Sequence, residues 1–315
     1  MNMATEQSPK RFRLGISTSS FLYAMPRELA QFSVVAAQRG RASMFDARQN
    51  DMMQSFMREL MTAVNSSSIA SMECYHSLSW EKEPIIEILL DNLKVELWSV
   101  HAPYGRWFNP SSPEQESRNG ALAACMDAVY VATRLGARIL VVHPGADIPY
   151  DEPRDVRLKY AVEVLKRVAD AAGERSIKVA VEPMPLSEIG NTLEEIFAVI
   201  EGINRPNVGI NFDTNHLFPP EEIPDLIRQC GSLILSIHVS DQDGQERHWI
   251  PFKGTIDWQQ VLLALAEIGY EGPLMYEAHI REAENCLEVV RRVEENYAKL
   301  IQLAPREVVA KPLST

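Results

Sequence analysis

Residues 208–216 read VGINFDTNH. Apolar side chains at positions 208, 210 and 212 alternate with Gly209, Asn211 and Asp213, and a period of two is that of a β-strand with two different faces. In a closed parallel barrel, one face of each strand packs against an outer ring of helices and the other lines the interior. We therefore expect Asn211 and Asp213 to point into a barrel, with Asp213 at the C-terminal end of its strand.

Short strand patterns of this kind occur eight times between residues 14 and 303, separated by longer amphipathic patterns. The predicted strands are Leu14–Ser19, Ile69–Tyr75, Val95–Val100, Arg138–His143, Ile177–Glu182, Val208–Asp213, Ile234–Val239 and Leu274–Glu277. The predicted helices include Glu114–Leu135, Arg154–Ala172, Leu193–Ile203, Trp258–Ile268 and Ala283–Leu303. Eight strands, each followed by a helix, is the number that closes a parallel barrel.

The chain is therefore predicted to form one domain, a single (β/α)8 TIM barrel over residues 14–303. Its 315 residues, 46% of them hydrophobic, suffice for one large core. Residues 1–13 are expected to form a disordered N-terminal tail, and residues 304–315 a C-terminal tail. The region 40–66 is the weakest helix prediction, because serine and asparagine residues blur its ends.

Composition limits the classes of partner. The formal net charge of −12 disfavours a polyanion such as nucleic acid, because long-range repulsion would oppose its approach. The chain has no run of eighteen apolar residues, so no transmembrane helix is expected. The polar N-terminus lacks an apolar segment of signal-peptide length, which predicts a cytoplasmic protein. The four cysteines are far apart and form no CxxC pair, which argues against a disulfide framework.

Metal-ligating residue types gather at the predicted strand ends. Six of the seven histidines lie there, namely His76, His101, His143, His216, His238 and His279, while His248 lies in the loop after the seventh strand. Strands five to eight each supply one inward group, and we call these four the quartet: Glu182, Asp213, His238 and Glu277. Three crowded carboxylates repel one another, and a divalent cation would hold them together. Oxygen-rich ligation with one imidazole suits Mn²⁺, Mg²⁺ or Co²⁺, with Zn²⁺ also open, and ligand type alone does not choose among them. We expect one divalent metal and take it to be Mn²⁺.

Other residues near the strand ends have two interpretations. A single histidine at a strand end is more often structural, and we prefer that interpretation for His76 and His279. Tyr104, Trp107 and Phe108 follow the third strand. They either form a wall for a substrate or pack over the rim of the barrel.

Seven short segments carry a resemblance. They are VHAPY (100–104), VVHPG (141–145), VEP (181–183), NFDTNH (211–216), IHVSD (237–241), the stretch RHW…GTIDW (247–258) and MYEAH (275–279). Together they resemble the xylose-isomerase-like TIM barrel superfamily. This superfamily includes sugar phosphate isomerases and epimerases and the endonuclease IV type of DNA-repair nuclease, AP endonuclease family 2.

Resemblance to the epimerase branch implies that the quartet binds one metal, with Glu182 and Glu277 as an acid/base pair on either side of the substrate. A metal that chelates a carbonyl and the neighbouring hydroxyl would stabilise the enediolate formed when a carbon-bound proton leaves. The resemblance also implies substrate contacts for Glu188 and His216. The arginine that epimerases often carry after the strand-seven histidine has no clear counterpart here.

Resemblance to the endonuclease branch implies a three-metal cluster with further ligands. These would be His101, His143, His216 and His248, and Glu246 stands where that branch has an aspartate. The acidic net charge and the lack of a basic stripe argue against this branch.

The same histidines have a rival role as hydrogen-bonding partners of sugar hydroxyls. The candidate substrate-binding residues are therefore His101, His143, Glu188, His216, His248, Tyr104 and Trp107, and His101 and His143 are also candidates for a second metal.

The leading hypothesis is a metal-dependent isomerase or epimerase of a small sugar, keto-sugar or polyol derivative. One alternative is a metal-dependent phosphodiesterase that acts on abasic DNA. Another is a lyase or dehydratase that acts on a keto-sugar or cyclitol, and a third class is a binding or scaffold subunit with a vestigial site. The expected partner is a small carbohydrate, without nucleic acid or membrane. A homo-oligomer and a small partner subunit both stay open.

Overall fold

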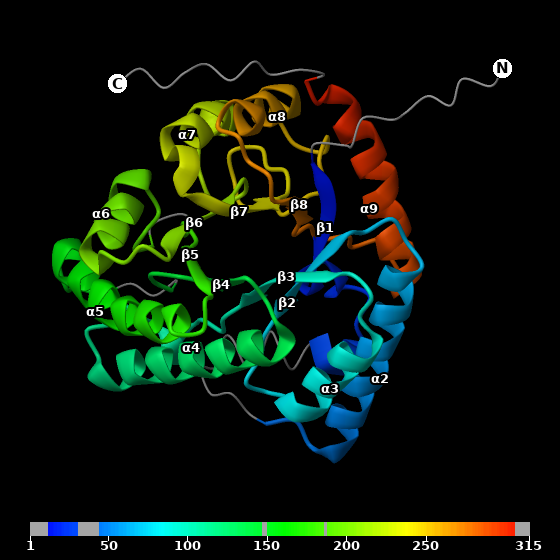
Figure 1. Ribbon diagram of the computed structural model, residues 1–315, viewed down its shortest axis with the longest axis horizontal. Coiled ribbons are helices and arrows are strands. Elements are labelled where there is room, and N and C mark those ends of the chain that lie inside the picture. Colours follow the sequence, from blue (N-terminus) through cyan, green and yellow to red (C-terminus); the bar gives the residue numbers. More distant parts are fainter. Residues whose placement is uncertain (1–11, 31–43, 147–149, 186–187, 306–315) are drawn as a thin grey trace.

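The computed structural model describes residues 12–30, 44–146, 150–185 and 188–305. Its strands form one closed parallel barrel in the order β1 to β8, and the helices surround it (Figure 1). The strands are β1 Arg13–Ser17, β2 Ser71–Tyr75, β3 Glu96–His101, β4 Ile139–Val142, β5 Lys178–Val181, β6 Val208–Asp213, β7 Ile234–Val239 and β8 Pro273–Tyr276. The predicted single TIM barrel is confirmed.

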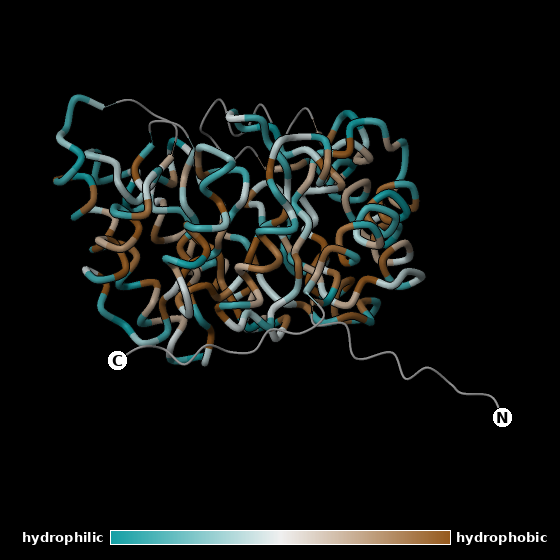
Figure 2. The backbone as a smooth tube through the Cα atoms, turned by 90° about the horizontal axis from the view of Figure 1, so that it is seen from above, coloured by the Kyte–Doolittle hydropathy of each residue, from teal (hydrophilic) through white to brown (hydrophobic). Residues whose placement is uncertain are grey.

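The helices that cover the barrel follow their strands in sequence. They are α2 Ala47–Asn65, α3 Lys82–Asn92, α4 Gln115–Leu135, α5 Arg154–Gly173, α6 Leu193–Ile203, α7 Ile223–Cys230, α8 Trp258–Glu267 and α9 Cys286–Leu300. In Figure 2 the hydrophilic stretches lie mainly on the outer turns and loops. Within the described residues, no helix combines the length and the apolar character that a membrane span requires.

Strand parity sorts the side chains as expected. Leu140, Val142, Ile210 and Phe212 pack in the outer core against the helices, whereas Ile139, Val141, Ala180 and Met275 join Trp98 in a separate cluster inside the barrel. Position 209 requires glycine for a steric reason, because the Cβ of any other residue there would lie 2.4 Å from the carbonyl oxygen of Leu233. This apolar cluster fills part of the barrel interior, and the polar side chains lie at the C-terminal ends of the strands, at the mouth of the barrel.

Several element boundaries agree with the expectation and others differ. β6, β7 and α6 have the predicted bounds, and Thr192 caps α6 by accepting a hydrogen bond from the backbone N–H of Glu195 at 3.3 Å. The last helix is shorter than expected: α9 begins at Cys286 after the capping residue Asn285, and residues 301–303 form a 3-10 turn.

The two ends of the barrel and its weakest predicted helix differ slightly from expectation. Phe12 is fully buried and Arg13 begins β1, so the barrel starts before residue 14. The remainder of the predicted N-terminal tail, residues 1–11, lies outside the described residues, as do residues 306–315. In the region 40–66, a capping box formed by Asp46 and Gln49 starts α2.

Candidate active site

The quartet converges at the C-terminal ends of β5 to β8. Each member offers one ligand atom, and these four atoms all lie within 4.8 Å of one another. Nδ1 of His238 lies 2.5 Å from Glu277 Oε2, 3.4 Å from Glu182 Oε1 and 3.7 Å from Asp213 Oδ2. Glu182, Asp213 and His238 are at most 1% exposed, and Glu277 is 9% exposed. Three carboxylates thus surround one imidazole nitrogen in a buried place.

The donor set fits a divalent cation. Asp213 Oδ2 is buried and has no hydrogen-bond donor among the described residues, and an unpaired buried carboxylate oxygen is costly unless a cation neutralises it. Carboxylate oxygens with one imidazole are a ligand set suited to Mn²⁺, Mg²⁺, Co²⁺ or Zn²⁺. The residues present therefore form a possible metal-binding site.

The electrostatics of the quartet point to the same conclusion. Burial by itself would lower the pKa of His238, but Glu277, Glu73 and Glu182 overcome it and hold this pKa well above its ordinary value. Burial would raise the pKa of Glu182, yet the surrounding histidines, led by His238, keep it well below its ordinary value. The carboxylates at the C-terminal ends of β5, β6 and β8 therefore favour a positive charge at the centre of the quartet.

A residue that sequence reasoning missed, Glu73 of β2, holds the other side of His238. Nε2 of His238 lies 3.0 Å from Glu73 Oε1, and Glu73 Oε2 accepts a hydrogen bond from Ser99 Oγ at 2.7 Å. Glu73 is fully buried. The alternation of Ser71, Glu73 and Tyr75 with Met72 and Cys74 is the same parity signal that found the quartet, and it would have identified Glu73 as an inward group.

Glu73 orients the imidazole of His238. Its carboxylate contacts Nε2, which fixes the ring and leaves Nδ1 facing the three carboxylates of the quartet. Carboxylate partners of this kind raise the ligand strength of a histidine. We expect Glu73→Gln to weaken Mn²⁺ affinity by about 10- to 100-fold, since such partners typically contribute that much. Isothermal titration with Mn²⁺ measures the change.

The matched control is Glu96→Gln, which alters a glutamate that pairs with Arg13 and Arg138. It should leave Mn²⁺ affinity within about twofold, because surface ion pairs contribute little. If Glu73→Gln binds Mn²⁺ as tightly as Glu96→Gln, Glu73 does not position His238.

Two further groups of potential ligands flank the quartet. One is His101, His143 and Glu182, and the other is His216, Glu246 and His248. Nδ1 of His101 lies 2.9 Å from the carbonyl oxygen of Ala102, so Nδ1 carries the proton and Nε2, 3.4 Å from Glu182 Oε2, faces the quartet. Burial lowers the pKa of His143 to about 3, which keeps this imidazole neutral.

The second flanking group has the same arrangement. Nδ1 of His216 lies 3.0 Å from the carbonyl oxygen of Pro183, and Nδ1 of His248 lies 3.3 Å from that of Glu277. Each Nδ1 therefore carries a proton, and Nε2 of His248 lies 3.4 Å from Glu246 Oε1. The structure brings together every histidine that the sequence singled out at the mouth.

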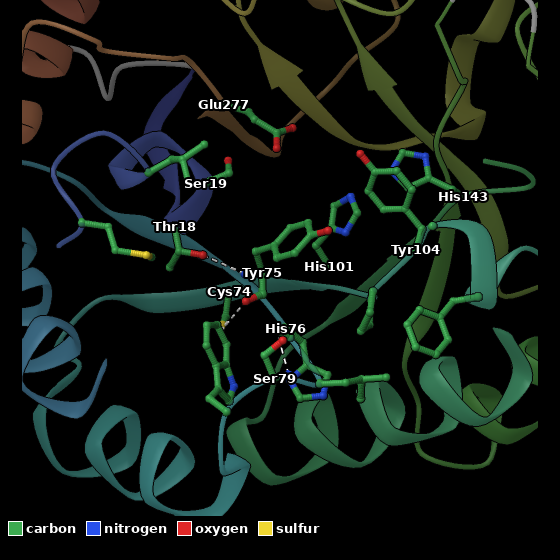
Figure 3. A pocket seen from close by; sticks show the side chains of 18 of the residues that line it. Thr18, Ser19, Cys74, Tyr75, His76, Ser79, His101, Tyr104, His143 and Glu277 are labelled. Atoms are coloured by element: carbon green, nitrogen blue, oxygen red, sulfur yellow. Dashed lines mark hydrogen bonds between the residues drawn. The ribbon is translucent and has the colours of Figure 1, made fainter. Parts of the chain in front are cut away.

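The histidines line a cavity of about 380 Å³ at the mouth of the barrel. Figure 3 shows Glu277, His101, His143 and Tyr104 on one side of it. The Tyr104 ring lies 4.1 Å from that of His143. Within the described residues, Trp107 Nε1 and His143 Nδ1 are buried without a hydrogen-bond partner, and both residues belong to the lining of this cavity.

Three further candidates, His76, His279 and Glu188, lie outside the quartet and the two flanking groups. Nε2 of His76 lies 2.8 Å from Asp127 Oδ2, and this bond is the largest cause that lowers the pKa of Asp127 to about 2. This contact favours the structural interpretation of His76. The His279 ring lies against that of His248 and lines the cavity. Glu188 is buried but is not among the cavity-lining residues, so a direct substrate contact for it stays a prediction.

Comparison of the sequence with models of known protein families gives a match over most of the barrel. The model of the xylose isomerase-like TIM barrel family matches residues 65–304. The chain belongs to this family. Among the curated proteins, an uncharacterized protein of Methanocaldococcus jannaschii, MJ1311, is 30% identical over 230 residues, which is 69% of this chain and 76% of the relative.

Members with named activities match over shorter stretches. D-psicose 3-epimerase of Agrobacterium fabrum is 30% identical over 145 residues, 44% of this chain and 49% of the epimerase. A probable endonuclease 4 of Acholeplasma laidlawii is 31% identical over 121 residues, 38% of this chain and 40% of the relative. This chain therefore spans half or less of the length of these relatives.

The solved structures agree on the fold. D-allulose 3-epimerase from Methylomonas sp., solved in complex with D-allulose, superposes with a TM-score of 0.69. The match covers 92% of this chain and 98% of that structure at 17% sequence identity. At this identity the likeness establishes the shared fold alone.

Proposed function

We propose that this member of the family is a metal-dependent isomerase or epimerase of a small sugar, keto-sugar or polyol derivative. The observation that carries the proposal is a pair of buried carboxylates, Glu182 and Glu277. Both belong to the same cluster of potential metal ligands, and both line the cavity. Such a pair, with a cation at the same place, suits removal and return of a proton next to a carbonyl.

Each residue has a distinct part in this chemistry. Glu277 accepts the carbon-bound proton on one side of the substrate, and Glu182 donates or accepts on the other. Asn211 holds Glu182 in place, since its Nδ2 donates to Glu182 Oε2 at 2.9 Å. A divalent cation held by the quartet would polarise the substrate carbonyl and stabilise negative charge on its oxygen. His101, His143, His216 and His248 position the hydroxyls.

The similarity to D-psicose 3-epimerase supports a sugar substrate. We propose a divalent metal cofactor, because the quartet offers three carboxylates and one imidazole, and we take Mn²⁺ as the first ion to test among Mn²⁺, Mg²⁺, Co²⁺ and Zn²⁺. We also propose a cytoplasmic location, which fits the four free, buried cysteines. Chromatography of products from a panel of ketoses and aldoses, incubated with Mn²⁺-loaded protein, tests the proposal and identifies the substrate by conversion to an epimer or isomer.

The two flanking ligand groups favour a second candidate, a metal-dependent phosphodiesterase that acts on abasic DNA. Three neighbouring ligand groups could hold three cations around a phosphate. Against this candidate, Arg106 is the only lysine or arginine among the described residues that line the cavity, whereas DNA binding needs several phosphate contacts.

We therefore expect no nicking of a duplex oligonucleotide with one abasic site, at a protein concentration that converts the sugar substrate completely. Gel electrophoresis of the end-labelled strand measures nicking. Efficient nicking that is lost in His101→Ala and kept in the control Glu96→Gln, which lies outside the cavity lining, would replace the isomerase proposal with the nuclease.

A further inference from the structure

The cavity has two chemically different sides. Glu182 and Glu277 of the quartet form its polar end, together with the flanking histidines His101, His143, His216 and His248. Opposite them lies what we call the apolar wall, made of Leu22, Met25, Met53, Phe56, Met57, Leu60, Cys74, Leu78 and Trp80. Figure 3 places Glu277, His101 and His143 toward one side, and Cys74 toward the other. One continuous cavity therefore joins a sugar-sized polar site to an apolar surface.

The apolar wall is more than core packing that meets a cavity. Met53, Phe56, Met57 and Leu60 of α2 are almost fully buried and belong to the core. Leu22, Met25, Leu78 and Trp80, however, come from the loops after β1 and β2 and are only half-buried. These four side chains are partly exposed and belong to the lining of the cavity, and ligand pockets are lined predominantly by hydrophobic and aromatic side chains.

A bare monosaccharide would use this wall poorly. A hydroxyl group held against an apolar surface loses its hydrogen bonds to water, and without replacements that loss is unfavourable. Three hydroxyls near the wall already have partners in the protein. Ser19 Oγ donates to Ser17 Oγ at 2.9 Å, Thr18 Oγ1 accepts from Tyr75 N at 2.8 Å, and Ser77 Oγ accepts from Ser79 N at 3.2 Å. Nε2 of His76 is engaged by Asp127. The wall therefore fits an apolar group better than another sugar.

The volume of the whole cavity and the composition of the wall indicate what kind of ligand fits. A volume of about 380 Å³ falls within the range of roughly 300–1,000 Å³ of pockets that hold drug-sized ligands. Phe56 and Trp80 offer aromatic surfaces, and the thioethers of Met25, Met53 and Met57 contact aromatic rings favourably. A flat aromatic ring uses both kinds of surface at once.

We propose that the substrate is a keto-sugar derivative with an aryl substituent, such as the keto form of an aryl glycoside, whose carbonyl meets the two carboxylates. The sugar lies at the polar end and the aryl group lies on the apolar wall. This inference rests on the proposed function, because it names the substrate class of that same site.

The test compares matched phenyl and methyl glycosides of glucose, galactose and xylose by isothermal titration calorimetry with Mn²⁺-loaded protein. In at least one pair, the phenyl glycoside should bind about tenfold or more tightly than the methyl glycoside, because burying a phenyl ring removes a large apolar area from water. Equal affinities in every pair, or no measurable binding of any phenyl glycoside, would overturn the inference.

Variants of the wall locate the effect. Met25→Gln and Leu78→Asn should each reduce the phenyl preference by about fivefold or more, because both place a polar amide on the wall. Both positions are half-buried, which favours retention of the fold. The matched control is Leu90→Asn, an exposed leucine of α3 that does not line the cavity and should keep the full preference. A preference kept in both wall variants also contradicts the proposal.

The experiments distinguish failure of the aryl-substrate inference from failure of the proposed isomerase function. Epimerisation of an unsubstituted ketose without any phenyl preference would leave the isomerase and remove the aryl substrate. A phenyl preference that the wall variants lose, without conversion of any free sugar or of any keto form of an aryl glycoside, would leave the binding site and remove the isomerase.

Discussion

Glu277→Gln should lower the rate of substrate isomerisation by about 1,000-fold, while the protein still binds Mn²⁺ when the ion is supplied in excess. Glutamine keeps the shape of glutamate and one oxygen ligand, but it cannot accept a proton. Loss of a general base typically costs about 10²- to 10⁴-fold in rate. Measured kcat at saturating Mn²⁺ and substrate gives the effect, and metal analysis of the same sample gives the occupancy.

A matched glutamate in the loop after β8 provides the control. Glu282 is exposed and pairs with Lys253 at 3.0 Å. Glu282→Gln should therefore retain at least half of the activity. If Glu277→Gln keeps full turnover, Glu277 is not the base, and the acid/base assignment of the two carboxylates is wrong.

His238→Ala should abolish metal binding and, with it, activity. The imidazole is fully buried and its Nδ1 lies among the oxygens of the three carboxylates, so its removal takes away one of the four proposed ligands and the group between the other three. We expect the Mn²⁺ content after gel filtration to fall from about one ion per chain to below about 0.1. Plasma mass spectrometry measures this content.

His279→Ala is the control for His238→Ala. Its ring also lines the cavity, but it lies against His248 and outside the quartet. This variant should keep its Mn²⁺. Retention of one tightly bound ion in folded His238→Ala, judged by circular dichroism, would remove His238 from the ligand set.

The sequence predicted the barrel and the quartet because both depend on period two. Once alternate residues of β6 face the helices, Asn211 and Asp213 have to face the interior, and parallel strands bring their C-terminal ends to one mouth. The same argument applies to Glu182 in the turn after β5, to His238 in β7, and to Glu277 directly after β8. These predictions needed no knowledge of side-chain conformation.

Other features could not come from the pattern alone. Which nitrogen of His238 faces the carboxylates depends on Glu73, which lies 165 positions away in the sequence. The two sides of the cavity also depend on packing, since Met53 and Met57 of α2 look like ordinary core residues in a helical pattern. The contact between His76 and Asp127 joins the segment directly after β2 to α4 and has no local signal in the sequence.

The measurement that tests the central claim most directly is proton exchange followed by NMR in D2O. Protein stripped of metal and the same protein reloaded with Mn²⁺ are each incubated with ketoses, aldoses and oxidised 3-keto sugars. The account predicts deuterium at a carbon next to the carbonyl of at least one sugar, only in the reloaded protein and not in its Glu277→Gln variant. No exchange in protein shown to hold Mn²⁺, or equal exchange in the stripped protein, would contradict it.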